Sequence, residues 1–485
     1  MKILFLNPPF LPKYSRESRS PAVTKSGTLY YPAWLAYAAG YAETQNHTVD
    51  LIDAVADNMT IEEVLDRCKK FNPELLVVGT STPSIYNDME KSIFLKSNLS
   101  SIPKIALVGT HASSTADEIL KENSEIDFVA RREYDLTISH LADSISATQD
   151  LSLVDGLSWK SENTVVHNKD REYIQDLDII PFASKIYKRF FNIKNYFYAH
   201  VPYPTVSIFT SRGCDAKCDF CVYPQTMFGK FRARSAKNIA AEFEWIAKEL
   251  PEVKGILVDD DTFTMDQDHA IEVSKELIAI NNKIPFICEA RANLKYETMK
   301  WLKKAGCKLV VVGFESTDQQ VLNNMRKGMK MTLVHQFVKD AKQAKLKVHG
   351  CFMAGNPGDT KETLNKTLEF AIKHNFDTVQ FFPLQVYPGT RAYNWAIENK
   401  YLRKTDYREQ ITEDGNHNCL LNTPELSSQD LLDFCDSARR QYYLRPKFIF
   451  YKLIESIKDP LGEGRKTVKS FRTFARHLFS NVSAS

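Results

Sequence analysis

The stretch "SRGCDAKCDFC", residues 211–221, places three cysteines within eight residues, with three and then two intervening positions. Three thiolates can hold three irons of a cubane iron-sulfur cluster through Cys214, Cys218 and Cys221, which leaves the fourth iron open to a small molecule. A structural zinc site is the alternative, but it needs a fourth ligand, and no paired Cys or His lies nearby. The spacing therefore predicts a cluster that performs chemistry rather than one that only stores electrons.

The motif lies within a regular alternation of strand-like and helical segments. Strand-like runs begin at residues 205, 255, 285, 308, 348 and 378, and each precedes a segment with helical periodicity. Six such units predict a partial (β/α)6 barrel over residues 205–400, three-quarters of the usual eight-fold barrel. The cysteine loop follows the first strand, at the carboxyl face where barrel enzymes keep their active sites. A partial barrel also leaves a lateral opening suited to large substrates.

The first 145 residues show a second alternating series, from "KILFLNPP" to "DFVAR". We predict an α/β, Rossmann-like domain with a doubly wound parallel sheet over residues 1–145. Ligands of such sheets bind at the carboxyl ends of the strands, so the candidate edge contains Thr80, Ser81 and Gly109. No Gly-x-Gly-x-x-Gly follows the first strand, which disfavours a dinucleotide.

Two segments complete the predicted organisation. Residues 146–204 contain a strand-turn-strand pattern and an aromatic stretch, and we predict a connector that lies over the mouth of the active site. Residues 401–485 predict a helical C-terminal region. Within it, apolar residues recur at helical spacing between Arg465 and Phe479 among five basic residues. Such a helix is suited either to an anionic membrane surface or to packing on the barrel.

The bulk composition is typical of a globular protein that does not bind nucleic acid. Of 485 residues, 43% are hydrophobic, and 63 basic residues nearly balance 60 acidic ones. Nine cysteines without an apolar signal segment predict a cytoplasmic protein, peripheral on the inner membrane face if it contacts a membrane. Six cysteines outside the motif show no ligand spacing and are predicted to be buried or incidental thiols: Cys68, Cys288, Cys307, Cys351, Cys419 and Cys435.

The cysteine spacing, with Phe220 before the last cysteine, resembles the signature of radical S-adenosylmethionine (radical SAM) enzymes. The Rossmann-like domain ahead of the barrel resembles the class that carries a cobalamin-binding domain. This resemblance implies a [4Fe-4S] cluster, SAM and, at the edge named above, cobalamin. The loop that supplies a histidine to cobalt in the best-known cobalamin domains is missing, and we interpret His111 as a loop histidine. A Rossmann-like domain that only shapes the substrate site is the alternative.

The resemblance also implies roles for residues at the ends of the barrel strands. Asp260 and Asp261 would line the SAM amino group, and the alternative is a solvated acidic turn. Arg291 is suited to the SAM carboxylate, with Glu289 beside it, and the alternative is an ion pair between the two. Glu315 would accept ribose hydroxyls, or else cap the next helix. Residues predicted to bind SAM are Phe220, Asp260, Asp261, Glu289, Arg291, Glu315 and Gly355, the last by close backbone approach to the adenine.

Several stretches, among them "YYPAWLAYAAG" and "VDDDTFT", are similar to the hopanoid-biosynthesis radical SAM proteins. This similarity implies hydrogen abstraction from a lipid-linked substrate, with ring contraction of a hopanoid-attached sugar to a cyclitol ether, and a flavodoxin or ferredoxin as reductant. Methyl transfer to carbon by way of cobalamin is the alternative. An electron carrier or iron sensor would need a fourth ligand and no SAM pocket, and is disfavoured.

Overall fold

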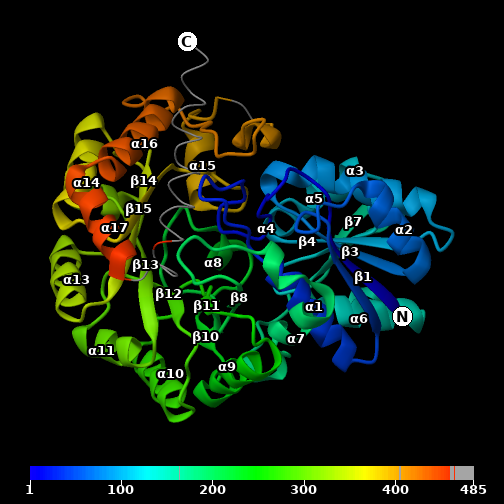
Figure 1. Cartoon of the computed structure of the whole chain (residues 1–485). Helices are drawn as coiled ribbons and strands as arrows, with labels where there is room; N and C mark the ends of the chain where they lie inside the picture. The colour runs from blue at the N-terminus through cyan, green and yellow to red at the C-terminus, as the bar shows by residue number, and fades with distance from the viewer. Residues whose placement is uncertain (163, 404–405, 459–463, 465–485) are drawn as a thin grey trace.

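The computed structural model describes residues 1–162, 164–403, 406–458 and 464. A seven-stranded sheet forms the N-terminal domain (Figure 1), in the order β2-β1-β3-β4-β5-β6-β7. The first five of its strands are parallel, and the last two join antiparallel at the β5 edge. The strands are β1 (Lys2–Asn7), β2 (Thr48–Asp53), β3 (Leu75–Gly79), β4 (Lys104–Val108), β5 (Phe128–Ala130), β6 (Leu157–Ser161) and β7 (Thr164–His167).

Helices cover both faces of this sheet, because its strands are Val-, Ile- and Leu-rich runs that are buried on both sides. One core contains α1 (Ala33–Thr44), α6 (Asp135–Ser146) and α7 (Ala183–Phe190). The other contains α2 (Ile61–Phe71), α3 (Ile85–Asn98) and α5 (Ala116–Glu122). Short helices η1 (Thr82–Ser84) and α4 (Thr110–Ser114) follow β3 and β4 at the carboxyl edge. The predicted doubly wound sheet is therefore present, with two antiparallel strands added.

A six-stranded parallel sheet forms the second domain, in the order β8-β11-β12-β13-β14-β15. Its strands are β8 (Thr205–Ile208), β11 (Gly255–Val258), β12 (Phe286–Ala290), β13 (Cys307–Glu315), β14 (Lys347–Ala354) and β15 (Thr378–Pro383). The accompanying helices are α9 (Ala236–Glu249), α10 (Gln267–Ala279), α11 (Tyr296–Lys304), α12 (Gln319–Asn324), α13 (Met331–Gln343), α14 (Lys361–His374) and α15 (Arg391–Glu398). In Figure 1, α9, α10, α11, α13 and α14 lie around the outside of this sheet. The predicted partial (β/α)6 barrel is confirmed.

Residues 146–204 differ from the predicted connector over the active-site mouth. The hairpin β6–β7 pairs with β5 and so extends the N-terminal sheet. Farther along, Tyr198 and Val201 pack against Leu257, Ile287 and Leu309, which lie on the inner face of the barrel strands. A partial barrel leaves apolar side chains on that face uncovered, and the aromatic stretch buries them.

The C-terminal region packs mainly on the open edge of the barrel. It contains η5 (Tyr407–Gln410), α16 (Ser428–Tyr443) and α17 (Pro446–Lys458), and α16 packs against β15 and β14. The helix predicted between Arg465 and Phe479 lies outside the described residues. None of the helices in the described residues combines the length and apolar character that a bilayer span requires.

Candidate active site

The three motif cysteines lie on the loop between two short strands, β9 (Ser211–Arg212) and β10 (Arg232–Ala233), which pair antiparallel. All three are free of disulfides, and Cys218 is buried. Burial raises the pKa of Cys221 well above its usual value, and Asp261 and the other two cysteines raise it further. The three sulfurs are thus close enough to repel one another as thiolates. Iron would remove that repulsion, so the donor set fits a cluster.

Two polar side chains lie next to these sulfurs. Nη1 of Arg291 lies 3.9 Å from Sγ of Cys218, and Oγ1 of Thr262 lies 3.6 Å from Sγ of Cys214. The hydroxyl of Thr262 also donates to O of Asp261 at 2.6 Å. Within the described part of the chain, no three His, Cys, Asp or Glu side chains gather in the way that a single metal ion requires.

The N-terminal domain holds both strands that flank the cysteine loop. Arg212 on β9 donates to both oxygens of Asp135, at 2.7 and 3.0 Å. Arg232 on β10 donates to both oxygens of Glu133, at 3.0 and 2.6 Å. The side chains of Arg212 and both acids are at least 95% buried. Two-pronged pairs of this kind fix orientation as well as distance, so the loop is aligned on the N-terminal domain.

Asp260 does not face the cysteines, although the sequence predicted a SAM contact for it. Its carboxylate accepts from the backbone N–H groups of Thr210 and Ser211, at 2.6 and 3.1 Å, and from both hydroxyls, at 2.5 and 2.7 Å. Both oxygens are therefore occupied, and Asp260 holds the start of the cysteine loop. Among the described residues, Asp261 accepts a hydrogen bond from the backbone N–H of Gly213 alone, at 3.1 Å, and it remains beside the cysteines.

Arg19, from the long loop after β1, reaches across to the end of β11. It donates to Oδ1 and O of Asp259, at 2.9 and 3.0 Å, and to O of Asp260. It also lies 3.9 Å from Glu289. Burial raises the pKa of Glu289 to about 8, against the lowering influence of Arg19. Among the described residues Glu289 pairs with Arg19 rather than with Arg291, so the alternative of a Glu289–Arg291 ion pair does not hold.

Arg291 and Glu315 meet around Lys327. Nη2 of Arg291 donates to O of Lys327 at 2.5 Å, and Nζ of Lys327 lies 2.8 Å from Oε1 of Glu315. The same ammonium lies 5.6 Å from the ring centre of Phe220. Oε2 of Glu315 is buried and has no hydrogen-bond partner among the described residues. An unpaired buried carboxylate oxygen is costly, and a ligand hydroxyl would satisfy it, which fits the predicted ribose contact.

The helix-capping alternative for Glu315 does not hold, because Asp318 caps α12.

The packing around Gly355 explains why a glycine stands at this position. It adopts φ +99°, and a Cβ there would come within 2.8 Å of Leu431 on α16. Its lack of a side chain therefore serves the packing of α16, and the predicted adenine contact stays a prediction.

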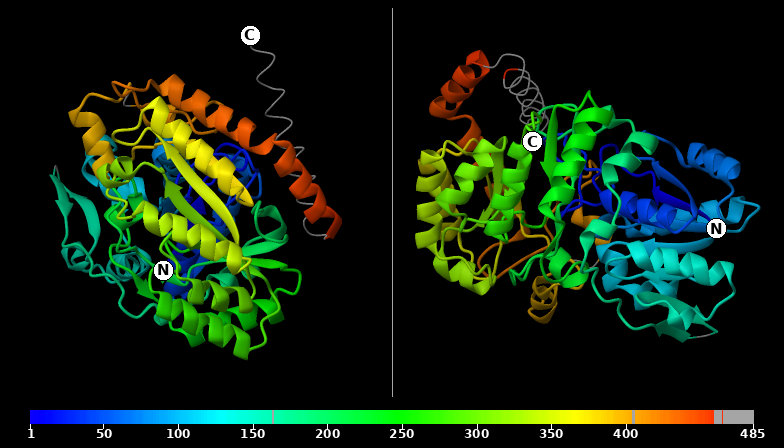
Figure 2. Two further views of the ribbon diagram at one scale, coloured as in Figure 1. Left: turned by 90° about the vertical axis from the view of Figure 1, so that its left-hand side faces the viewer. Right: turned by 90° about the horizontal axis from the view of Figure 1, so that it is seen from below.

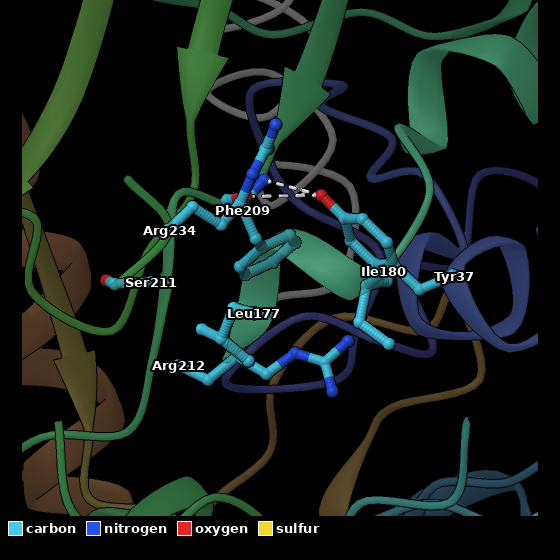
Figure 3. A pocket seen from close by; sticks show the side chains of 7 residues that line it. All are labelled: Tyr37, Leu177, Ile180, Phe209, Ser211, Arg212 and Arg234. Atoms are coloured by element: carbon cyan, nitrogen blue, oxygen red, sulfur yellow. Dashed lines mark hydrogen bonds between the residues drawn. The ribbon is translucent and has the colours of Figure 1, made fainter. Parts of the chain in front are cut away.

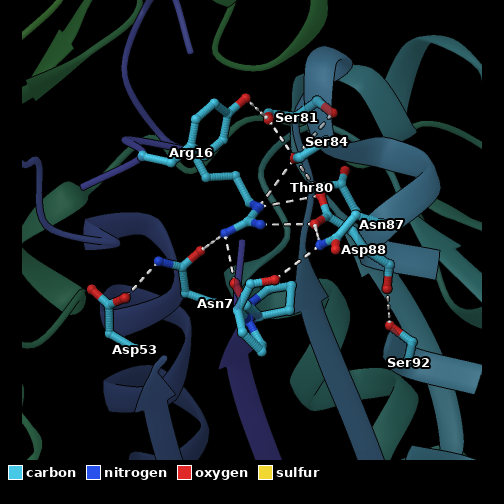
Figure 4. Close-up of polar contacts among 12 residues, drawn as sticks. Asn7, Arg16, Asp53, Thr80, Ser81, Ser84, Asn87, Asp88 and Ser92 are labelled. Carbon is cyan, nitrogen blue, oxygen red and sulfur yellow. Dashed lines mark hydrogen bonds and ion pairs between the residues drawn. The ribbon is translucent and has the colours of Figure 1, made fainter. Parts of the chain in front are cut away.

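The predicted cobalamin edge is a closed polar network (Figure 4). Oγ1 of Thr80 donates to O of Val108 at 2.8 Å, and Oγ of Ser81 lies 2.8 Å from the hydroxyl of Tyr14. Gly109 has φ +117°, and a Cβ there would come within 2.6 Å of O of Thr80. Arg16 fills the middle of the network, with partners Asn7, Ser84 and Asp88. The side chains of Thr80 and Ser81 are thus turned to the protein.

His111 is buried on α4 and has protein neighbours on both sides. Its Nδ1 lies 3.3 Å from Oγ1 of Thr82, and Tyr407 meets its ring edge-on at 4.7 Å. Burial lowers its pKa to about 3. Gln410, beside Tyr407 in η5, has a buried amide oxygen without a partner among the described residues. The packing of His111 against protein side chains fits a cobalamin bound without a histidine on cobalt, and Oε1 of Gln410 is an acceptor that an amide of such a cobalamin would satisfy.

The loops at the carboxyl ends of both sheets touch. Oγ of Ser113, after β4, lies 3.6 Å from Sδ of Met227, just past the cysteine loop helix α8 (Val222–Thr226). A Cβ at Gly389, after β15, would come within 2.9 Å of Cβ of Ser114, so a side chain there would force its neighbours to shift. Ser20, in the long loop after β1, contacts both the barrel and the C-terminal region. Its Oγ lies 3.0 Å from the hydroxyl of Tyr387, after β15, and 2.8 Å from Nε2 of His417 in the C-terminal region.

Two hollows lie near the cysteine loop. One of about 10 Å³ is shown in Figure 3 and has room for about one water molecule. It is lined by Tyr37, Leu177, Ile180, Phe209, Ser211, Arg212 and Arg234. The other, of about 410 Å³, is mostly polar and is lined by Asp215, Phe231, Met265, Asp266, Gln267, Asp268 and Lys295. The smaller hollow is a packing defect beside the Arg212 anchor rather than a substrate site.

Comparison with known proteins gives the same two-part organisation. Residues 208–371 match the radical SAM superfamily, and residues 19–142 match the B12 binding domain. A protein of Pyrococcus horikoshii named as an uncharacterized methyltransferase is 30% identical, over 94% of this chain and 95% of that protein. The anaerobic magnesium-protoporphyrin IX monomethyl ester cyclase of Synechocystis is 25% identical, over 85% and 81%. The hopanoid C-3 methylase of Methylococcus capsulatus is 22% identical, over 78% and 70%.

A solved structure shares the fold over most of its length. The radical SAM methyltransferase TsrM of Kitasatospora setae, solved with cobalamin and a [4Fe-4S] cluster, has a TM-score of 0.67, with 90% of each chain covered and 14% sequence identity. At this level of identity the likeness concerns the fold.

Proposed function

Because the chain belongs to the radical SAM superfamily, among the members with a B12 binding domain, we propose that it is a methyltransferase that acts on a carbon atom of its substrate. It is a radical SAM enzyme, and its cofactors are a [4Fe-4S] cluster, SAM and cobalamin. The 30% identity to a protein named as a methyltransferase, over 94% of this chain, carries the proposal. Ring contraction of a hopanoid-attached sugar finds no support among these relatives, and the alternative of methyl transfer fits them better.

Contact between the two domains supports the proposal, because it brings the predicted cobalamin edge next to the cysteine loop. Loops from the carboxyl ends of both sheets touch at Ser113 and Met227, and Arg19 spans from the N-terminal domain to the end of β11. When bound, the reduced cluster would supply the electron that splits SAM into methionine and a carbon-centred radical, and cobalamin would carry the methyl group that is transferred. A methyl group can pass from cobalamin to a substrate radical formed beside SAM only if the two cofactors lie close to each other.

The residues of the chain bind and orient these groups. Cys214, Cys218 and Cys221 would hold the cluster, while Asp260 and the Arg212–Asp135 pair fix the loop that carries them. Arg291 would bind the SAM carboxylate and Glu315 a ribose hydroxyl. A lipid-linked substrate, and a flavodoxin or ferredoxin as reductant, remain proposals from the family resemblance.

Methyl transfer is tested by anaerobic incubation of the reconstituted enzyme with SAM, reduced cobalamin and a chemical reductant, followed by mass spectrometry. We expect S-adenosylhomocysteine and methylcobalamin in equal amounts, because a methyltransferase must load its carrier from SAM. Formation of 5′-deoxyadenosine without S-adenosylhomocysteine would instead favour a cyclase-type reaction without methyl transfer.

Replacement of Arg291 by Ala should weaken SAM binding by about 1.5 to 3 kcal/mol, or about 10- to 150-fold, since a charge-assisted contact is lost. Equilibrium binding of SAM to the reconstituted protein measures the change. Arg67→Ala is the control for the loss of a paired, partly buried arginine, because Arg67 pairs with Asp50 in the N-terminal domain, far from the cysteine loop. If the two variants bind SAM with equal affinity at equal iron content, Arg291 does not contact SAM.

A further inference from the structure

The last described helix, α17, presents large apolar side chains to solvent. Ile449, Phe450, Leu453 and Ile457 are 45%, 66%, 54% and 77% exposed. At 100° per residue these four positions fall within an arc of about 100°. They therefore form one continuous surface, here called the apolar face of α17. Single exposed apolar residues are ordinary, but four on one helix face mark an interaction site.

The opposite side of α17 is fixed to the barrel, so the helix cannot roll to bury this face. Phe448 is buried against Tyr442 and Tyr443 of α16. The hydroxyl of Tyr451 donates to Oδ1 of Asp377 at 2.6 Å, and Nζ of Lys347 lies 2.6 Å from Glu455. In both views of Figure 2 the helix lies at the outer edge of the barrel.

Charge indicates what covers the face. Lys447 and Lys458 are exposed at the two ends of α17, whereas its acid, Glu455, is paired with Lys347 on the barrel side. In the sequence, residues 464–485 add five basic residues and no acid. An apolar stripe flanked by lysines is complementary to the headgroups and acyl boundary of an anionic bilayer.

We propose that the apolar face of α17 docks on the surface of an anionic lipid bilayer, with Phe450 and Leu453 at the centre of the contact. The helix lies in the plane of the interface and does not cross the membrane. This surface is independent of the proposed methyl transfer, because α17 contacts the barrel from outside and none of its residues lies at the cysteine loop.

The test compares full-length Phe450→Ser/Leu453→Ser protein with the parent in co-sedimentation with vesicles of phosphatidylcholine, with and without phosphatidylglycerol. Removal of the two central apolar side chains should weaken binding to the anionic vesicles about tenfold or more, because their insertion supplies the apolar part of the affinity. Added salt should weaken the parent's binding as well. The matched control is Ile102→Ser/Leu153→Ser, which changes two residues of similar exposure in the N-terminal domain and should bind as the parent does.

Hydrogen exchange provides a second readout, since anionic vesicles should protect residues 446–458 in the full-length protein. Equal vesicle binding by the parent and the Phe450→Ser/Leu453→Ser variant would overturn the proposal and assign the contact elsewhere in the chain. If the parent is a dimer and the Phe450→Ser/Leu453→Ser variant is a monomer, a second copy of the chain covers the face instead. A melting temperature lowered in this variant but not in the control would show that the chain itself covers it.

Discussion

Cys218→Ala protein, reconstituted anaerobically with iron and sulfide, should neither retain a four-iron cluster nor cleave SAM. Each of the three thiolates fixes one iron, and loss of one leaves two open irons where the chemistry needs a single one. Cys214→Ala and Cys221→Ala should behave in the same way. The measurements are iron and sulfide content, the visible absorbance of the cluster, and 5′-deoxyadenosine formed in the presence of SAM and reductant.

Cys68→Ala is the matched control for this loss. Cys68 is also a buried free thiol, but it lies on α2 in the N-terminal domain, away from the loop. We expect it to bind iron and cleave SAM as the parent does. A Cys218→Ala protein that still forms 5′-deoxyadenosine at the rate of the Cys68→Ala protein would refute the assignment of the three cysteines.

The sequence predicts the cluster motif and the barrel because both signals are local. The cysteine spacing is contained in eight residues, and strand and helix periodicities repeat every few residues. The roles within "DDDTF" were harder to predict, since three neighbouring carboxylates look alike. The alternation of side-chain direction along a strand still distinguishes them. Asp259 and Asp261 continue the inner face of Leu257, whereas Asp260 must point the opposite way, toward Thr210 and Ser211.

Contacts between the two domains leave no comparable pattern in the sequence. Arg19 meets Asp259 across 240 positions of the chain, and Arg212 meets Asp135 across 77. Each arginine is an unremarkable polar residue in its own stretch of sequence, so only the folded chain shows that it is buried against an acid. The same holds for Lys327, which links Arg291 to Glu315. Sequence patterns thus locate the strand ends that form the site, while the ion pairs that arrange them depend on the tertiary fold.

These interdomain pairs predict a large loss of stability in Asp135→Ala. The side chain of Arg212 is 4% exposed, and its guanidinium donates to both oxygens of Asp135. Glu133, at 3.8 Å, is a more distant and weaker partner. Removal of one member of a buried ion pair leaves an uncompensated charge and costs about 3 to 5 kcal/mol. Urea unfolding of the protein measures the loss. Asp117→Ala, which breaks the exposed pair with Lys121 on α5, should leave the free energy of unfolding essentially unchanged.

A compensating change separates the charge effect from a simple packing defect. In Asp135→Ala/Arg212→Met the buried charge is gone together with its partner, so much of the lost stability should return, because replacement of a whole buried pair by apolar groups is often close to neutral. The cysteine loop would then lose its alignment even though the fold is stable, since β9 no longer has a two-pronged contact to α6. We therefore expect the double variant to unfold nearly as the parent does but to take up iron less completely. If the double variant is no more stable than Asp135→Ala, the cost arises from the cavity left by the carboxylate. If it is stable and loads iron fully, the Arg212–Asp135 pair stabilises the domain interface without positioning the cysteines.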